Sequence, residues 1–203
     1  MTVAWTKRRF SGGLLVLDAA NTVILRGDPA RTFDRFGDTS EIGRFAAAAE
    51  GFRSAELGGR GLSFENAGAR VRHVIVFREA ADRLFRSAAA TGEIRTGHLR
   101  EFLLACATCL DTDEDRVGVD GMPFGDPSQP IRFEAALAVS ALSLLAGDVW
   151  KKVRICPNCN WLFVDRSRNS SRLWCDMSVC GNRHKARLHY ERRRGAPKEA
   201  VHA

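Results

Sequence analysis

The chain lacks the apolar segments that would place it in a membrane or send it out of the cell. Its longest apolar run lies within residues 133–147, contains Glu134 near its start and is too short to cross a bilayer. The apolar stretch Leu14–Leu17 leads directly into Asp18 and has no small-residue cleavage pattern, so we expect no signal peptide. A cytoplasmic protein with no membrane partner is therefore predicted.

The sequence also lacks the short motifs that mark common enzyme sites. It has no Walker phosphate loop, no G-x-S-x-G or H-E-x-x-H motif and no dinucleotide fingerprint. His73 and His98 have no acid or cysteine at a catalytic spacing. We therefore expect no enzyme activity, and keep an active site in the N-terminal part as an alternative.

Acidic residues are scarce in the last quarter of the chain. Residues 1–150 hold 18 Lys and Arg against 20 Asp and Glu, a net charge of −2, whereas residues 151–203 hold 13 against 4, a net charge of +9. The basic excess thus lies entirely at the C-terminal end. It predicts a polyanionic partner for that part alone, with a solvated basic surface as the alternative.

Length and composition are those of a globular protein. The 203 residues are 45% hydrophobic and 27% charged, which allows one ordinary domain and a small module. The sequence predicts an α+β fold, with a helix-rich N-terminal domain and a small sheet over residues 1–150. A C-terminal module is expected over residues 151–195 and a flexible tail over residues 196–203.

Helical periodicity is clear in four segments. It predicts helices over about 38–51, 66–90, 98–110 and 132–152, with Gly147 as an interruption in the last. Periodicity does not decide whether Leu14–Leu17 is a buried strand or the start of a helix. Residues 117–119 alternate with polar neighbours and are predicted to form one arm of a hairpin.

Four of the six cysteines have the spacing of a metal site. Cys156, Cys159, Cys175 and Cys180 form the pattern C-x2-C-x15-C-x4-C, in which two close pairs can converge on one tetrahedral zinc ion. All four ligands come from the protein, so the ion is expected to be structural. Iron fits the same ligands, and a redox-active dithiol at Cys156 and Cys159 is a further alternative that leaves the second pair unexplained.

A second C-x-x-C pair, Cys106 and Cys109, has no partner pair. It lies in an apolar helical pattern, and free cysteine packs as a small hydrophobic side chain. Core packing is therefore predicted for these two thiols, with a metal or redox role as the alternative.

The local pattern around the metal ligands predicts a strand, a hairpin and a helix. Residues 161–164 form the strand, and residues 172–174 are the expected returning arm beyond a polar turn. Ser178 is predicted to cap a final helix that contains Cys180 in its first turn. This order gives a treble-clef-like four-cysteine zinc module.

The module resembles the CGNR zinc finger, named for the motif that stands here at residues 180–183. The Cys156-x-x-Cys159 knuckle, residues 163–168, Trp174-Cys175 and the trailing arginines match it in order. Upstream, Leu17-Asp18 and Asn21-Thr22 resemble the start of the ABATE-type domain to which this finger is usually fused. The resemblance implies a bacterial transcription regulator that acts in a stress or ligand response.

Basic side chains of the module are the predicted DNA contacts, because phosphates attract clustered Lys and Arg. They are Arg166, Arg168 and Arg172 on the hairpin and Arg183, Lys185, Arg187 and Arg194 on the last helix. An alternative for Asn182 and Arg183 is to brace the knuckle or to pair with Asp165. A homodimer is one expectation, since DNA-reading regulators are often dimers; a protein-interaction module is the alternative function.

Asp18 and Asn21 are polar residues in an apolar stretch near the N-terminus. They are interpreted as the edge of a pocket for a small-molecule effector. The alternative is a hydrogen bond at a cap or turn.

Overall fold

The computed structural model describes residues 2–111, 115–118 and 123–195, and this part of the chain is rich in helices. The α-helices are α1 (Leu15–Ala20), α2 (Ser40–Phe52), α3 (Ser54–Leu57), α4 (Gly68–Thr91), α5 (Thr96–Cys109), α6 (Phe133–Ala146) and α7 (Asn182–Gly195). Short turns of helix are η1 (Lys7–Phe10), η2 (Arg35–Gly37), η3 (Asp148–Lys152) and the π-helical η4 (Met177–Gly181). The predicted tail at residues 196–203 lies outside the described residues.

The strands are short and pair two by two. They are β1 (Val23–Ile24), β2 (Phe33–Asp34), β3 (Leu62–Ser63), β4 (Ile131–Arg132), β5 (Val153–Ile155) and β6 (Leu162–Val164). The pairs β1–β2 and β5–β6 are antiparallel, whereas β3 and β4 are parallel. In the described residues the sheets therefore stay small, and helices supply most of the fold.

The four predicted long helices are present as α2, α4, α5 and α6. Gly147 ends α6, so the expected segment beyond it is the separate turn η3. Leu15 begins a helix, which settles the ambiguity left by its apolar run. Val117 and Gly118 are not in a strand, and Val119 of the predicted hairpin arm lies outside the described residues.

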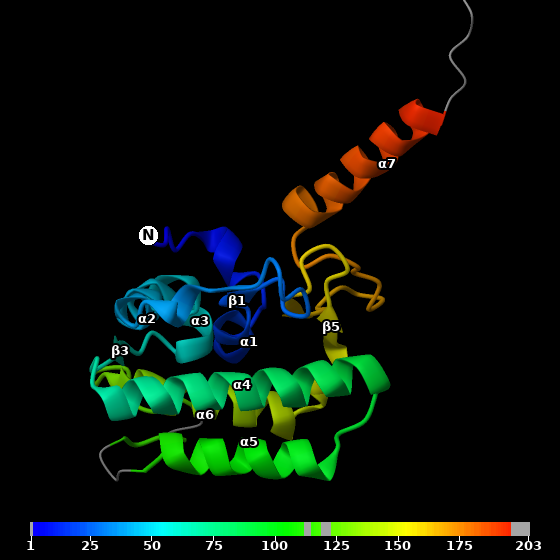
Figure 1. Cartoon of the computed structure of the whole chain (residues 1–203). Helices are drawn as coiled ribbons and strands as arrows, with labels where there is room; N and C mark the ends of the chain where they lie inside the picture. Colours follow the sequence, from blue (N-terminus) through cyan, green and yellow to red (C-terminus); the bar gives the residue numbers. More distant parts are fainter. Residues whose placement is uncertain (1, 112–114, 119–122, 196–203) are drawn as a thin grey trace, which may run out of the picture.

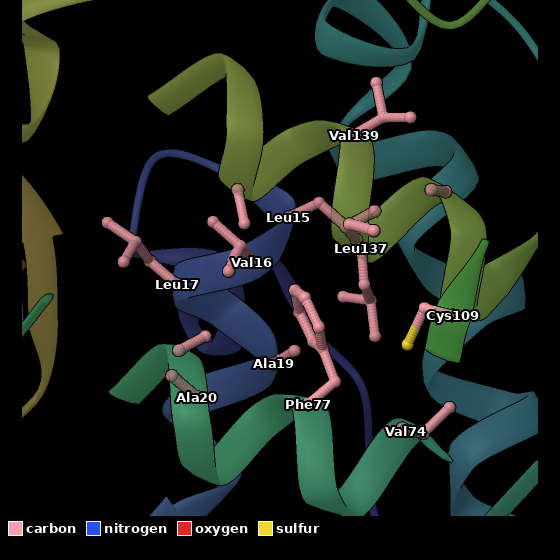
Figure 2. Close-up of a cluster of buried hydrophobic side chains, with 14 of the residues drawn as sticks. Leu15, Val16, Leu17, Ala19, Ala20, Val74, Phe77, Cys109, Leu137 and Val139 are labelled. Carbon is pink, nitrogen blue, oxygen red and sulfur yellow. The ribbon is translucent and has the colours of Figure 1, made fainter. Parts of the chain in front are cut away.

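The main core forms where α1 meets α4 and α6. Every residue of α1 is buried, and Figure 2 shows Leu15, Val16 and Leu17 among side chains from α4 and α6 such as Phe77 and Leu137. In α6 the first nine residues are all buried. A helix that is apolar on every side belongs inside a protein, which explains its central position.

Helices α4 and α5 form an antiparallel pair that covers one side of the core (Figure 1). Phe102 of α5 packs between Phe77 and Phe85 of α4, with ring centroids 6.0 and 5.9 Å apart. Cys106 and Cys109 lie in this core, which confirms the predicted packing. Burial raises the pKa of the Cys106 thiol to about 12, so that thiol stays protonated.

The segment before η1 is tied to α2. The backbone N–H of Val3 and the indole N–H of Trp5 both donate to the carboxylate of Glu41, at 3.0 and 2.8 Å. The Trp5 ring also lies 5.0 Å from the Phe45 ring in an edge-to-face contact. These contacts fix the position of the arginines that follow Trp5.

The β5–β6 hairpin belongs to the same core. Val153, Leu162 and Val164 pack in the cluster that contains α1, α4 and α6. The backbone N–H of Val164 donates to the carbonyl oxygen of Gly12 at 2.9 Å. A Cβ on Gly12 would lie 2.8 Å from Asp18 Oδ1 and 2.9 Å from Leu17 Cβ, so only glycine fits where these backbones meet.

Helix α7 projects from the C-terminal segment, away from the packed helices (Figure 1). Within the described part of the chain, no helix has both the length and the apolar character needed to cross a membrane.

Candidate metal centre

The first cysteine pair lies in the turn between β5 and β6. Register pairs Val153 with Val164 and Ile155 with Leu162, and Cys156 follows immediately. The N–H of Cys156 donates to the Trp161 carbonyl at 2.9 Å, and Asn160 N–H donates to the Cys156 carbonyl at 2.8 Å. Asn160 has a φ of 62°, a left-handed conformation that asparagine accepts more readily than most residues. The strands and this turn hold the two thiols close together.

This pairing corrects one prediction. Residues 161–164 were expected to pair with a returning arm at residues 172–174, but β6 pairs with β5 and residues 172–174 are not in a strand. The hairpin therefore encloses the first cysteine pair alone. The second pair reaches the site through an irregular loop.

The second pair is held at the start of the last helix. Cys180 lies in the turn η4, and Asp176 caps this turn by accepting a hydrogen bond from Val179 N–H at 3.2 Å. Ser178, the predicted cap, instead donates its hydroxyl to the Asp176 carboxylate at 2.6 Å. Both side chains are good capping groups, and the turn begins two residues earlier than the sequence pattern indicated.

The four sulfur atoms have the geometry of a zinc site. The Sγ atoms of Cys156, Cys159, Cys175 and Cys180 all lie within 4.8 Å of one another. Two of the separations are 3.4 Å, between Cys159 and Cys175, and 3.7 Å, between Cys175 and Cys180. Tetrahedral zinc with Zn–S bonds of about 2.3 Å needs sulfur atoms roughly 3.8 Å apart. All six cysteines are free thiols, so the donors fit the ion and no disulfide competes for them.

Electrostatics favour a cation at this point. Hydrogen bonds from Cys159 and Cys175 lower the pKa of Cys156, and the matching contacts with Cys156 raise the pKa values of Cys159 and Cys175. Within this group of three thiols, ionisation of Cys156 therefore opposes ionisation of Cys159 and Cys175. A divalent cation removes this limit, because it stabilises every thiolate that binds it.

Residues beside the ligands position them. The side-chain N–H of Asn158 donates to Cys180 Sγ at 3.4 Å, a contact that stabilises thiolate charge. A Cβ on Gly181 would collide with Met177 Sδ and lie 3.3 Å from Trp174 Cδ1, so a larger residue here would require the exposed Met177 side chain to move. The amide of Asn182 donates to the Ser178 carbonyl at 2.9 Å. Asn182 thus braces the turn η4 rather than the Cys156–Cys159 knuckle, which was the alternative interpretation.

Asp165 organises the loop between β6 and the second cysteine pair. It is fully buried, and its carboxylate accepts from Ser167 N–H at 2.9 Å, from the Ser167 hydroxyl at 2.6 Å and from Arg172 N–H at 3.0 Å. Its partners are these two residues, not Arg183 as one interpretation suggested. Three hydrogen bonds to one carboxylate offset the cost of burying it.

Arg172, a predicted DNA contact, is used within the finger. Its Nε donates to the Trp174 carbonyl at 2.7 Å, and its guanidinium also donates to the Cys175 carbonyl. The guanidinium lies 5.1 Å from the centre of the Phe163 ring. These contacts hold the approach to Cys175, and the Arg172 side chain remains exposed.

The other predicted basic residues are exposed. Arg166 donates to the Gly13 carbonyl at 3.2 Å, and Arg187 lies 3.7 Å from the carboxylate of Glu191. Arg194 stacks over the Tyr190 ring at 5.4 Å. Arg168, Arg183 and Lys185 are exposed on the same finger and helix. The structure therefore brings this set onto one module.

Asp18 and Asn21, the predicted pocket residues, are both buried and both bonded within the fold. Asp18 accepts hydrogen bonds from Gly12 N–H at 2.8 Å and from Arg53 Nε at 2.5 Å. Burial raises the pKa of Asp18 to about 7, although Arg53 opposes this shift. The Asn21 amide donates to the Leu162 carbonyl and accepts from its N–H, each at 2.8 Å. Asn21 therefore pairs with β6 as a neighbouring strand would.

Three residues of the site were not identified from the sequence. They are Asn158, which donates to Cys180 Sγ, Asp165, which accepts the hydrogen bonds that order the loop, and Asp176, which caps η4. Asp176 has a signal in hindsight, since an aspartate three residues before Val179 is a normal capping position. The other two act through partners that local patterns do not reveal.

Comparison with known families agrees with this geometry. Residues 152–193 match the family model described as the CGNR zinc finger. No curated protein matches the chain. Residues 152–193 are therefore similar to the CGNR zinc finger, and their four converging cysteines are positioned to bind one structural zinc ion.

Proposed function

We propose that this protein is a bacterial transcription regulator that binds duplex DNA through its zinc finger and α7. The N-terminal helices, similar at their start to an ABATE-type domain, form the regulatory part. We assign no enzyme activity to the protein. A knuckle between two strands, followed by a helix that begins beside the last cysteine, supports the treble-clef-like interpretation of the finger.

The observation that carries the proposal is the charge and exposure of α7. The helix holds six Lys and Arg residues and one acid, Glu191. Arg183, Arg187 and Arg194 follow one another at positions i, i+4 and i+11, which places them on one face. The pair of Arg187 with Glu191 is exposed and contributes little to stability, so Arg187 can exchange it for a phosphate.

The salt dependence of binding tests this proposal. Four to six phosphate contacts predict a log–log slope of about −4 to −5 between binding constant and salt concentration, because each contact releases condensed counterions. Arg187→Ala should weaken binding to all duplex sequences alike and make the slope shallower by about one. Fluorescence anisotropy of labelled duplexes with the zinc-loaded protein measures both.

Arg100→Ala, at an exposed position of α5, is the matched control and should leave affinity and slope unchanged. The proposal fails if duplex binding is negligible at low salt. It also fails if joint replacement of Arg168, Arg187 and Arg194 has no effect. A protein-interaction role for the finger would then take its place.

A further inference from the structure

A cavity of about 400 Å³ lies between the N-terminal segment and the zinc finger. One wall comes from the segment around η1 and from β1 and η2, and the other from the knuckle and η4. This volume is in the range of sites that take small molecules. The cavity is separate from Asp18 and Asn21, which do not line it.

The cavity wall is rich in arginine. Arg8, Arg9, Arg35 and Arg183 line it, and the accompanying carboxylate is that of Asp176. Among the described residues, none of these four guanidinium groups forms an ion pair, whereas many other arginines of the chain do. One oxygen of Asp176 is already occupied by Val179 N–H and the Ser178 hydroxyl.

Arg35 is the most unusual of the four because it is buried. Its exposed fraction is 7%, and its guanidinium lies 5.9 Å from the Trp5 ring centre and 5.4 Å from that of Trp161. The one hydrogen bond that its guanidinium makes within the described part of the chain goes to the Asn21 carbonyl and is long, at 3.4 Å. Burial, together with Arg9 and Arg8, lowers the pKa of Arg35 to about 10. Contacts with aromatic rings recover part of the cost of an unpaired buried charge, and an anion would recover the rest.

Trp161 supplies an unsatisfied donor. Its indole Nε1 is buried and has no hydrogen-bond acceptor among the described residues. Ile24, Leu25 and Val179 add apolar surface to the same cavity. A ligand that fits these walls has an acidic group for the donors and an apolar body.

The zinc centre limits the charge of that ligand. Cys159, Cys175 and Cys180 also line the cavity, and one Zn²⁺ with four thiolates carries two negative charges in total. With Asp176, these charges offset three of the four arginines. One positive charge is left for an occupant.

The geometry points to a binding site for a small organic monocarboxylate with an apolar or aromatic body. The carboxylate is held by Arg35, and the indole N–H of Trp161 donates to it. The site stands whether or not the protein binds DNA. Any effect of the ligand on DNA binding rests on the proposed function, since Arg183 and Val179 connect the cavity to the start of α7.

Binding of simple carboxylates, measured without DNA, tests the site. A panel that runs from acetate to benzoate, phenylacetate and indole-3-acetate is titrated into the full-length zinc-loaded protein, each beside its neutral amide. The Trp161 Nε1–H signal, assigned by its loss in Trp161→Phe, is followed by NMR. We expect the larger carboxylates to shift it and the amides to leave it in place. Arg35→Gln should weaken binding about ten- to hundredfold, the usual effect of losing a charge-assisted hydrogen bond.

Further variants keep the result decisive. If Arg35→Gln does not fold, Arg8→Gln at the exposed rim of the cavity should still weaken binding, and Arg100→Gln on α5 should not. The site is refuted if no carboxylate moves the Trp161 signal, which would mean that the arginines only balance the thiolate charge. Equal binding of acids and amides also refutes it. A shift caused by duplex DNA alone would assign these arginines to DNA phosphate instead.

Discussion

Cys180→Ser in the full-length protein is expected to abolish zinc binding and to unfold η4 and α7. Ligand thiolates and metal fold together, so the free energy of zinc binding is part of the free energy of folding. The finger's own core contains only Cys156, Phe163, Cys175 and Cys180 with a few partly buried neighbours, which is too little to stand without the ion. Metal analysis should find bound zinc falling from one ion per chain to none. Circular dichroism should lose helical signal equal to the 14 residues of α7.

Cys106→Ala is the matched control, because Cys106 is buried in α5 and belongs to the main core. This variant should keep its zinc and the α7 signal. Metal analysis of the unaltered protein also separates zinc from iron, which the same four thiolates can hold. Freshly purified protein with two disulfides and no metal would contradict the zinc site.

Loss of zinc should also lower the stability of the N-terminal helices. Val153, Leu162 and Val164 of the finger's hairpin pack in the main core, so loosening the hairpin exposes that core as well. Each 1 kcal/mol lost should lower Tm by about 2–4 °C for a chain of this size. An unchanged Tm of the main transition in Cys180→Ser would indicate that the hairpin holds its place without the metal.

Asn21→Ala is expected to lower the free energy of unfolding by about 2–6 kcal/mol, as measured by urea unfolding. The change removes both hydrogen bonds to Leu162 and leaves that residue's buried N–H and carbonyl without partners. Each unsatisfied buried group costs about 1–3 kcal/mol. The effect should be larger than that of losing a surface asparagine, which is normally within about 0.5 kcal/mol.

Asn66→Ala, at an exposed position, is the control for this measurement. Asn21→Asp gives a second comparison, because the carboxylate still accepts from Leu162 N–H but has no donor for the carbonyl. It should destabilise the protein as well. If Asn21→Ala is as stable as Asn66→Ala, Asn21 is not needed to hold β6.

The long helices and the metal ligands could be predicted from the sequence because both have local signals. The apolar periodicity of α4 and the spacing of Cys156 and Cys159 are each contained in a short window. The partner of β6 has no such signal. Residues 172–174 and β5 are both close enough in sequence to pair with β6, and packing on α1 and α4 selects β5.

Polar residues were harder to interpret. Asn21 was expected at a ligand pocket, yet its partner Leu162 lies 141 residues further along the chain. Arg172 was expected to bind DNA, and the sequence did not indicate that it also donates to the carbonyl groups of Trp174 and Cys175. Residue type shows that a side chain needs a hydrogen-bond or charge partner. Only the fold decides whether that partner is another part of the chain or a separate molecule.

Helix α7 points away from the packed helices and follows η4 directly, so a rotation at η4 (the pivot) would move its far end most. At 1.5 Å per residue, the 14 residues of the helix span about 21 Å. A tilt of roughly 10° at the pivot would therefore move the far end by about 4 Å, comparable to the spacing between neighbouring helical turns. Cys180 lies in η4 and Asp176 caps it. A small rotation of the backbone at these residues would therefore displace the far end of α7 and change which surface Arg194 can reach.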